Sequence, residues 1–298
     1  MQHLPDIVYT WVQGEDPDYR RLVSQFSGKP QHINPERYRD QFELLRYSLR
    51  SLERNFPHYR NLYLVTMRPQ KPEWLNAEHP RIKLVHHDEF FASKEYLPTF
   101  NHNTIESYIH LLPGLADRFI YMNDDFLFGQ STGNDDLFPG GRPRIFGSLW
   151  GEKWKFRIFD GSWLSLGFIE HCPVPILKAA WSEMQTIVPD EILATRQGKF
   201  RDKHHIRMDR LYTHYMLKYR PEQCEVSPFY KTRQLSEFVK IGNHLKEEER
   251  KIRRLRGNLK KFICLNDDQG EEPNQAVIEL YREFLAGAYP EKSTFEIW

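Results

Sequence analysis

The sequence has only three cysteines among its 298 residues, and this scarcity excludes two kinds of stabilisation. The cysteines are odd in number and far apart, so they do not form the framework of a small disulfide-rich protein. No C-x-x-C pair and no H-E-x-x-H motif occurs, although the chain has 13 histidines. A structural zinc site is therefore not expected.

Motifs of several common enzyme classes are also missing. There is no G-x-x-x-x-G-K phosphate loop, no G-x-G-x-x-G fingerprint and no G-x-S-x-G elbow. These motifs supply the phosphate cradle or the nucleophile in the proteins that use them. Their absence removes the main sequence support for a P-loop kinase, a dinucleotide-dependent dehydrogenase or a serine hydrolase.

The chain also lacks a large excess of charge and long apolar runs. Its formal net charge of +1 offers no strong sequence-independent attraction to nucleic-acid phosphates. No stretch approaches the about 18 apolar residues of a membrane-spanning helix, and the first residues do not resemble a secretory signal. We therefore expect no nucleic-acid partner and a cytoplasmic location. Attachment to the inner face of a membrane and a longer parent chain stay open.

What is present is a core-forming composition and two basic segments. Hydrophobic residues make up 40% of the chain and charged residues 28%, which is typical of a packed globular protein. Aromatic residues reach 14%, which suits either an ordinary core or stacking on sugars and bases. The basic segments 201–210 and 246–261 either meet an anionic substrate or membrane surface or form solvated helix faces.

Apolar patterns in the first 125 residues predict alternating strands and helices. Short β-rich runs predict strands at 6–11, 61–67, 81–86 and 118–122. Apolar residues spaced by three and four predict helices at 36–56, which Pro57 stops, and at 103–112, which Asn103 or Thr104 caps. This order predicts an α/β fold with a mostly parallel sheet flanked by helices.

The second part of the chain is expected to be mainly helical. Residues 131–175, with Trp150, Trp154 and Trp163, predict loops and a hairpin that act as a lid or face the substrate. Helices are expected at 176–188, 207–219, 246–256 and 274–289, and a late strand at 261–265 is expected to return to the sheet. We expect one domain over 1–298, with a sheet core in 1–130, loops in 131–175 and a mostly helical part in 176–298.

Two Asn-Asp-Asp triplets directly follow apolar runs, at 123–125 and at 266–268. Parallel sheets bind ligands beyond the carboxyl ends of their strands, and the first triplet falls at such an end. Carboxylates there can hold Mg²⁺ or Mn²⁺ and leave positions for substrate phosphates. Asn and Asp are also good turn residues, so each triplet alone fits a simple turn. Together they favour metal or phosphate handling, although spacing alone does not decide.

Other candidate residues are ambiguous when taken singly. Gly14 allows either a close backbone approach to a ligand or a tight turn. His171 precedes an expected helix and fits a structural or a catalytic role. Arg201 either neutralises phosphate oxygens or is a plain surface charge.

Four segments, in order, resemble the Stealth family of hexose-1-phosphate transferases. They are DIVYTWVQGEDP (6–17), the run 39–129 that ends in LADRFIYMNDDFLFG, the region 171–205 that begins with HCPVP, and KFICLNDD (261–268). Together they cover well over half of the chain, and the second is highly specific. The family includes bacterial capsule-polysaccharide phosphotransferases and the catalytic subunit of the animal enzyme that tags lysosomal hydrolases with GlcNAc-1-phosphate. Gln13 departs from the family, which usually has Asn or Asp there.

The resemblance implies a Rossmann-like catalytic core, a UDP-hexose or UDP-HexNAc donor such as UDP-GlcNAc, an oligo- or polysaccharide acceptor, and Mg²⁺ or Mn²⁺. It assigns catalysis to His171, Asp125 and Arg201. Metal binding falls to Asp124, Asp125 and Asp267, and binding of donor or substrate to Asp6, Trp11, Gly14, Asn123 and Asn266.

The reaction implied is transfer of a sugar-1-phosphate from the UDP-sugar to an acceptor hydroxyl, with release of UMP, in capsule or exopolysaccharide synthesis. One alternative is a conventional metal-dependent glycosyltransferase, which would release UDP. Another is a non-catalytic polysaccharide-binding module that uses the tryptophans of 150–163. The sugar, the acceptor, peripheral membrane association and a homodimer stay open.

Overall fold

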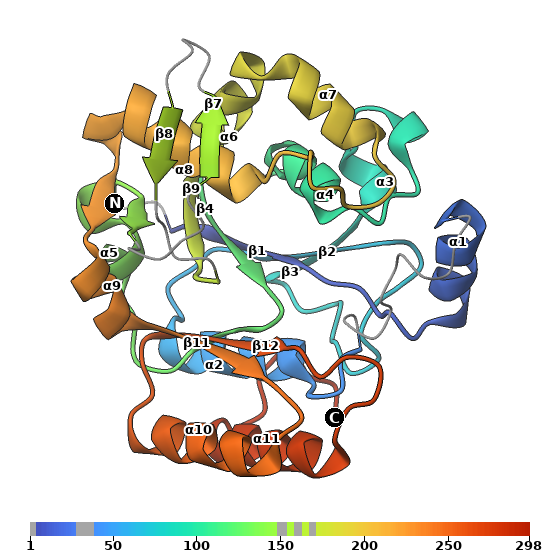
Figure 1. The fold of residues 1–298 in the computed structure, drawn as a ribbon, viewed down its shortest axis with the longest axis vertical. Helices are drawn as coiled ribbons and strands as arrows, with labels where there is room; N and C mark the ends of the chain where they lie inside the picture. Colours follow the sequence, from blue (N-terminus) through green and yellow to red (C-terminus); the bar gives the residue numbers. More distant parts are fainter. Residues whose placement is uncertain (1–3, 28–38, 148–153, 158–162, 167–170) are drawn as a thin grey trace.

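A five-stranded sheet lies at the centre of the computed structural model, which describes residues 4–27, 39–147, 154–157, 163–166 and 171–298 (Figure 1). In the order β3-β2-β1-β4-β9, its strands are β3 (Ile82–His86), β2 (Leu62–Thr66), β1 (Asp6–Thr10), β4 (Arg118–Asn123) and β9 (Val174–Leu177). The first four strands are parallel and β9 is antiparallel to β4. The predicted mostly parallel α/β sheet is confirmed.

A second sheet, of three strands, lies beside the first. Its order is β11-β12-β5, with β11 (Ser236–Ile241), β12 (Phe262–Asp267) and β5 (Phe126–Phe128). β12 is parallel to β11 and antiparallel to β5. The late strand was expected to return to the main sheet, and this was wrong because its backbone pairs with β5 and β11.

Four further strands form two small pairs. β6 (Arg144–Phe146) is parallel to β10 (Glu225–Ser227), and β7 (Trp154–Arg157) is antiparallel to β8 (Trp163–Leu166). The hairpin expected in 131–175 is thus confirmed by β7 and β8. Trp150 lies outside the described residues.

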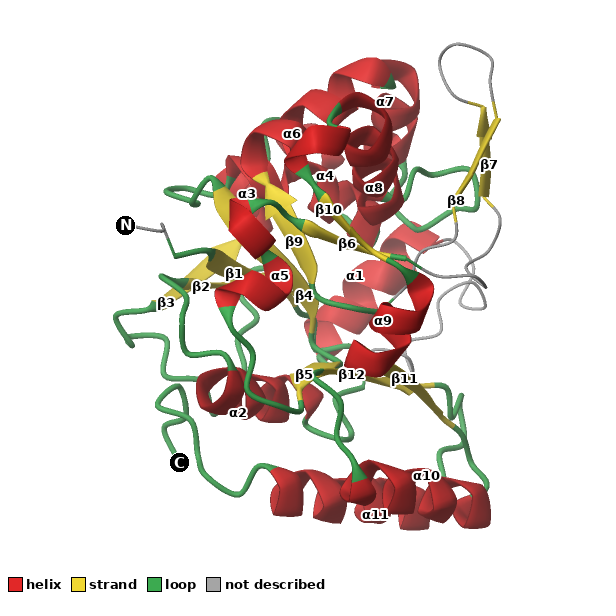
Figure 2. Cartoon of the chain, turned by 90° about the vertical axis from the view of Figure 1, so that its left-hand side faces the viewer, coloured by secondary structure: helices red, strands yellow, loops and turns green. Residues whose placement is uncertain are grey.

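Helices cover both sides of this pair of sheets. They are α1 (Pro17–Ser27), α2 (Leu44–Asn55), α3 (His87–Phe90), α4 (His102–Tyr108), α5 (Asn134–Leu137), α6 (Lys178–Glu183), α7 (Pro189–Gln197), α8 (Met208–Tyr219), α9 (Phe229–Leu235), α10 (Leu245–Gly257) and α11 (Gln275–Ala288). Helices α4, α6, α7 and α8 lie on one side of the main sheet, and α10 and α11 lie at the far end beyond β11 and β12 (Figures 1 and 2). No described helix has the length and apolarity needed to cross a membrane.

Three apolar clusters hold these layers together. The first joins one face of the main sheet to the helices above it and includes Val8, Phe119 and Trp181. The second joins the opposite face to α2 and to the second sheet and includes Ile7, Leu49, Ile120 and Phe262. The third joins the second sheet to α10 and α11 and includes Ile252, Ile263 and Tyr281. Alternate residues of β12, such as Phe262 and Ile263, therefore face different layers.

Three expected helix starts differ from the structure. α2 begins at Leu44, eight residues after the expected start at 36, because Glu43 has a left-handed backbone (φ 54°) and the Asp40 carboxylate accepts the Leu44 N–H at 2.7 Å. The cap of α4 is Asn101, whose side chain accepts the Asn103 N–H at 3.2 Å. Residues 174–177 form β9 instead of opening a helix, because they pair with β4 at the sheet edge. β9 also crosses the division expected at 175.

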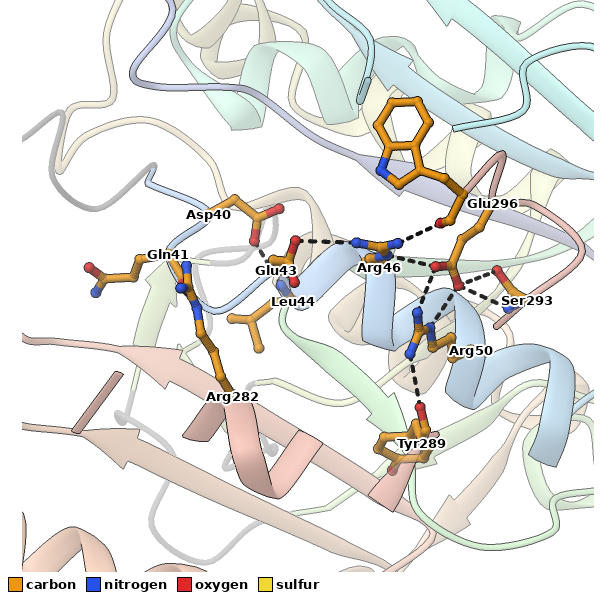
Figure 3. Close-up of polar contacts among 11 residues, drawn as sticks. Asp40, Gln41, Glu43, Leu44, Arg46, Arg50, Arg282, Tyr289, Ser293 and Glu296 are labelled. Carbon is orange, nitrogen blue, oxygen red and sulfur yellow. Dashed lines mark hydrogen bonds and ion pairs between the residues drawn. The ribbon is translucent and has the colours of Figure 1, made fainter. Parts of the chain in front are cut away.

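The last residues are bound to α2 by a charged cluster (Figure 3). The Glu296 carboxylate, which is fully buried, accepts hydrogen bonds from Arg46 Nε at 2.6 Å and from Arg50 Nε and Nη2 at 2.7 Å. Ser48, also on α2, donates to the C=O of Phe126 in β5. The C-terminal segment and the second sheet are thereby joined to the same helix.

Candidate active site

The first Asn-Asp-Asp triplet lies where the two sheets meet. Asn123 ends β4 and pairs with Thr10 at the end of β1. Asp124 and Asp125 form a two-residue turn, after which the chain enters β5 of the second sheet. The C=O of Asp125 accepts the Leu265 N–H of β12 at 3.0 Å, so the turn is bonded to both sheets. The carboxyl end of β4 is thus a junction and not a free loop.

The two carboxylate oxygens of Asp125 have different surroundings. Oδ2 accepts a hydrogen bond from Cys264 Sγ at 3.2 Å and a long one from Asn266 Nδ2 at 3.4 Å. Oδ1 is buried and has no hydrogen-bond partner in the part of the chain that the structure describes. A buried carboxylate oxygen without a partner is costly, and a cation is one way to satisfy it.

His171 completes this group from a distant part of the sequence. Ligand atoms of Asp125, His171 and Cys264 lie within 4.8 Å of one another. His171 has φ 66°, a left-handed conformation that is uncommon for residues other than glycine. Its ring stacks on Phe238 of β11, with centroids 4.6 Å apart and planes 23° from parallel. Such backbone strain is often found at functional sites.

Burial raises the pKa values of both carboxyl groups in this acidic pair. Burial is the main cause for both carboxyls; for Asp124 the charges of Asp125 and Asp40 add to it, and its pKa lies well above the usual range. The pKa of Asp125 is also raised, although the bonds from Cys264 and Asn266 oppose the shift. The turn is therefore short of positive charge, and a bound cation would favour the ionised carboxylates.

A second polar group lies on the other face of the main sheet, near the same strand ends. The Tyr121 hydroxyl of β4 donates to Glu106 Oε1 of α4 at 3.0 Å and is 2.9 Å from Thr10 Oγ1 of β1. Burial and the charge of Asp209 raise the pKa of Glu106 to about 8, against the hydrogen bond from Tyr121 and the charges of two arginines. Glu106 is thus a proton-holding group close to the end of β1.

Arg201 belongs to this second group. Its side chain is exposed, and its charge acts on Glu106 and on His102, lowering the pKa of both. Burial, the main cause, and the charges of Arg201 and Arg207 bring the pKa of His102 to about 3. Arg201 is therefore near Glu106 and His102, on the side of α4.

Trp11 lies at the carboxyl end of β1. Its N–H donates to the C=O of Val65 at 3.0 Å, which places it beside Thr66, the last residue of β2. Trp11 Nε1 and Thr66 Oγ1 are both buried without a partner among the described residues. The nearby Gly14 is buried, and its C=O accepts Arg20 Nε at 3.2 Å. Two unpaired polar atoms at adjacent strand ends fit a polar ligand there.

Two of the expected site residues lie elsewhere. Asp6 is at the amino end of β1, opposite Phe119, and its carboxylate binds Arg60 Nε at 2.9 Å and the Ala116 N–H at 2.7 Å. Asp6 therefore lies at the opposite end of the sheet from Asn123, and its role in donor binding stays a prediction. Asp267 lies outside the metal-ligand cluster because β12 turns its side chain away from Cys264 and Asn266. It accepts Gln41 Nε2 at 2.6 Å instead.

Three residues of the site were not predicted from the sequence. Cys264 counted only as one of three cysteines without a disulfide framework, Glu106 fell inside the helix expected at 103–112 and was given no role, and Phe238 was not considered. Both Cys264 and Glu106 stand inside segments that resemble the family, two residues before Asn266 and eighteen residues before Asp124. The family resemblance could therefore have drawn attention to them. Phe238 has no such signal, since its place beside His171 depends on the pairing of β11 with β12.

The donor atoms of the site fit a divalent cation. Asp125 offers the unpartnered Oδ1, Asn266 offers an amide, and Asp124 adds a neighbouring negative charge. Oxygen atoms of this kind suit Mg²⁺ or Mn²⁺. The nitrogen of His171 and the sulfur of Cys264 lie in the same cluster and would also suit a softer metal. Asp124 itself is not among the clustered residues.

The fold and the site define a class of protein: a mostly parallel α/β protein with an acidic turn at the carboxyl end of a central strand, where such sheets bind ligands. Two family models then match the chain, Stealth protein CR2, conserved region 2, at residues 37–143, and Stealth protein CR4, conserved region 4, at residues 253–297. Together they span just over half of the 298 residues and contain Asp125, Cys264 and Asn266. The chain belongs to the Stealth family.

Curated relatives agree with this family. The chain is 31% identical to an exopolysaccharide phosphotransferase of Streptomyces coelicolor, over 98% of this chain and 52% of the relative. It is 26% identical to the capsular polysaccharide phosphotransferase WcwK of Streptococcus pneumoniae, over 98% of both. It is also 38% identical to the human N-acetylglucosamine-1-phosphotransferase subunits alpha/beta, over 50% of this chain and 12% of that protein.

The relatives differ greatly in length. This chain spans between 21% and 52% of the three exopolysaccharide phosphotransferases of Streptomyces coelicolor that it matches. Among solved structures, the galactosyltransferase LgtC with donor and acceptor sugar analogues matches 97% of this chain and 98% of that chain, with a TM-score of 0.43 and 11% identity. A likeness this weak identifies neither a ligand nor a reaction.

Proposed function

We propose that this protein transfers a sugar-1-phosphate from a UDP-sugar to a hydroxyl of an acceptor sugar, releasing UMP and leaving a phosphodiester between the sugars. The observation that carries the proposal is the unpartnered Oδ1 of Asp125 in a group with His171 and Cys264, at the carboxyl ends of the strands of a Stealth-family fold. Relatives named as capsular and exopolysaccharide phosphotransferases support a role in polymer synthesis.

The donor lies, in this proposal, across the ends of β1, β2 and β4. Its nucleoside part meets Trp11 Nε1 and Thr66 Oγ1, which have no other partner among the described residues. Its diphosphate meets the turn at Asp124 and Asp125, and Arg201 approaches from the side of Glu106. Asn123 and Gly14 lie along the same edge.

Asp125 and Asn266 would hold a divalent cation, Mg²⁺ or Mn²⁺, with Asp124 adding negative charge. Such a cation neutralises phosphate oxygens and so lowers the repulsion felt by an incoming hydroxyl oxygen. We expect its removal to abolish turnover, because two buried carboxylates alone would repel the diphosphate.

His171 is the proposed general base. Its imidazole accepts the proton of the acceptor hydroxyl while the hydroxyl oxygen forms a bond to the sugar-side phosphorus. The bond between that phosphorus and the bridging oxygen breaks, and UMP leaves with the electron pair. The bond from the sugar C1 to its oxygen is never broken, so the anomeric configuration of the donor is retained. We place the reaction in the cytoplasm, at the inner face of the membrane.

Identification of the released nucleotide tests this proposal. The purified protein would be incubated with a panel of UDP-sugars, Mg²⁺ and oligosaccharide acceptors, and the products separated by ion-exchange chromatography. We expect UMP, and no product after EDTA treatment. UDP as the sole nucleotide would instead identify a conventional glycosyltransferase. Glycan binding that survives both EDTA and the double variant Asp124→Ala/Asp125→Ala, without turnover, would identify a binding module.

A further inference from the structure

We propose that Phe238 is the platform on which an oligosaccharide acceptor places the sugar unit next to the reacting one. This inference rests on the proposed function and specifies its acceptor as a glycan of at least two units. An acceptor of this class needs a flat apolar surface beside the catalytic group, because the faces of sugar rings stack on aromatic rings.

The exposure of Phe238 sets it apart on its strand. Val239 and Ile241 of β11 are buried in the core against α10 and α11, whereas 45% of the Phe238 surface is exposed. Because neighbouring residues of a strand point to opposite faces, Phe238 points away from that core. β11 is the outer strand of its sheet in the described part of the chain, and Phe238 and Lys240 are both exposed, so a ligand can reach them.

The pairing of β11 with β12 places Phe238 beside the proposed catalytic group. Phe238 stands opposite Cys264, and Lys240 stands opposite Asn266. Side chains of paired residues lie on the same face of a sheet. Phe238 and Lys240 therefore lie on the same face of the sheet as Cys264 and Asn266, whose side chains bond to Asp125. They lie farther out, on the neighbouring strand β11.

The stacked ring of His171 sets the distance to the reacting unit. With centroids 4.6 Å apart, one face of Phe238 is occupied by His171 and the exposed surface lies beyond it. A sugar on that surface is about one ring farther from the histidine than the hydroxyl that reacts. It is thus the neighbouring unit, and not the reacting unit, that Phe238 holds.

Polar groups beside Phe238 complete the subsite. Lys240 Nζ pairs with Asp268 at 2.6 Å, and both side chains are partly exposed. An aromatic surface next to a charged pair offers stacking for the face of a sugar and hydrogen bonds for its hydroxyls. The same arrangement gives no particular advantage to a single sugar bound at His171.

The variant Phe238→Leu tests the proposal, since leucine still fills the space against His171 but has no flat face. With acceptors of one to four sugar units, we expect KM for the dimer, trimer and tetramer to rise about tenfold, the loss of one stacking contact. KM for the UDP-sugar and for a monosaccharide acceptor should change less than about twofold. Phe238→Trp should restore the preference for long acceptors. Tyr219→Ala is the matched control, because Tyr219 is 43% exposed and lies on α8.

Two results would overturn the proposal. Equal losses with monosaccharide and tetrasaccharide would show that Phe238 only positions His171, and an unchanged length preference would show no role. Saturation-transfer NMR without donor, with a panel of neutral and N-acetylated oligosaccharides, measures acceptor binding alone. It therefore distinguishes failure of the platform from failure of the proposed reaction. Tetramers should bind the wild type and Tyr219→Ala better than monomers do, and Phe238→Leu should lose that difference. No length dependence in the wild type would contradict the platform even if UMP is released.

Discussion

Asp125 combines two tasks that a carboxylate can perform at once. One oxygen is bonded to Cys264 and Asn266, which fixes the orientation of the side chain, and the other is left without a partner. An asparagine there could keep the first task, because an amide oxygen also accepts hydrogen bonds. It could not supply the negative charge that a cation requires.

Asp125→Asn should therefore abolish turnover and leave the fold intact. We expect the rate of UMP release to fall by at least about 100-fold, the usual scale for loss of one strong electrostatic contact to a transition state. The melting temperature at pH 7 should not fall, since a buried charge-bearing group is removed. Kinetics and thermal unfolding check both. Asp135→Asn, an exposed aspartate of the Asn-Asp-Asp triplet at 134–136, is the control, and activity of Asp125→Asn within tenfold of wild type would contradict the assignment.

Glu106 makes a prediction about pH. Burial raises its pKa from 4.5 to about 8, so the folded protein holds this proton more tightly than the unfolded chain does. The contribution of Glu106 to the stability of the fold is therefore lost as the pH rises from 4.5 to 8. Glu106→Gln cannot ionise, so its free energy of unfolding should fall less between pH 5 and pH 9 than that of the wild type. We expect the two falls to differ by roughly 2–4 kcal/mol. Chemical denaturation at both pH values measures this, with the exposed Glu191→Gln as control. If the stabilities of the wild type and of Glu106→Gln changed in parallel with pH, a raised pKa of Glu106 would be excluded.

At the scale of elements, α2 supports the site without touching a substrate. Ser48 binds the C=O of Phe126 on one side of the helix, and Arg46 and Arg50 bind Glu296 on another (Figure 3). The helix thus joins β5, which follows the acidic turn, to the C-terminal segment. Arg46 and Arg50 are four residues apart in the sequence and therefore lie on the same side of the helix.

Glu296→Gln should loosen this connection. Burial alone would raise the pKa of Glu296, but the bonds from Arg50 and Arg46 outweigh it and lower the pKa to about 2. The contribution to stability is present above pH 4.5 and is lost as pH falls towards 2. At pH 7 the variant should lose about 3 kcal/mol, because two arginines keep their charge beside a neutral amide. Denaturation at pH 7 and pH 3 should show the difference shrinking in acid. A constant difference, or an equal loss in the exposed Glu291→Gln, would contradict this.

At the scale of the whole molecule, the site is shared by two sheets. Asp124 and Asp125 follow a strand of the main sheet, whereas Cys264 and Asn266 belong to the second sheet. A ligand bound here connects layers that are otherwise joined by β5, α2 and apolar contacts. Binding should therefore stabilise the entire fold.

A UDP-sugar with Mg²⁺ should raise the melting temperature. At 100 times the dissociation constant the gain is about 2.7 kcal/mol, or about 5 °C for a protein of this size. EDTA and Asp125→Asn should each remove the shift, and differential scanning fluorimetry measures it. The same shift with EDTA present would show that the nucleotide binds without the cation.

Local sequence patterns predicted much of the central sheet. The apolar runs around Tyr9, Leu64, Leu84 and Ile120 became β1 to β4 within one or two residues, because a strand buried on both faces needs apolar residues almost throughout. β9 was missed, since Val174-Pro175-Ile176-Leu177 is too short to show a period and pairs only through β4. The start of α2 was missed because Glu43 turns left-handed where the apolar spacing continues.

The sequence by itself determined that a mostly parallel sheet ends in Asn123-Asp124-Asp125, and through its family segments it named Asp125, His171 and Asn266. From spacing alone it did not decide whether that triplet binds a ligand or is a simple turn, as at 134–136, where Asp136 accepts the Gly133 N–H at the start of a helical turn. Only the tertiary structure decided this, by pairing β5 with β12 and so bringing Cys264 and Asn266 to one carboxylate. The alternation along β12 turned Asp267 away, and the pairing of β11 with β12 placed Phe238 beside His171. The physical reason is that the two-residue period of a strand selects which side chains face a site, while the partner of that strand is chosen by contacts far away in the chain.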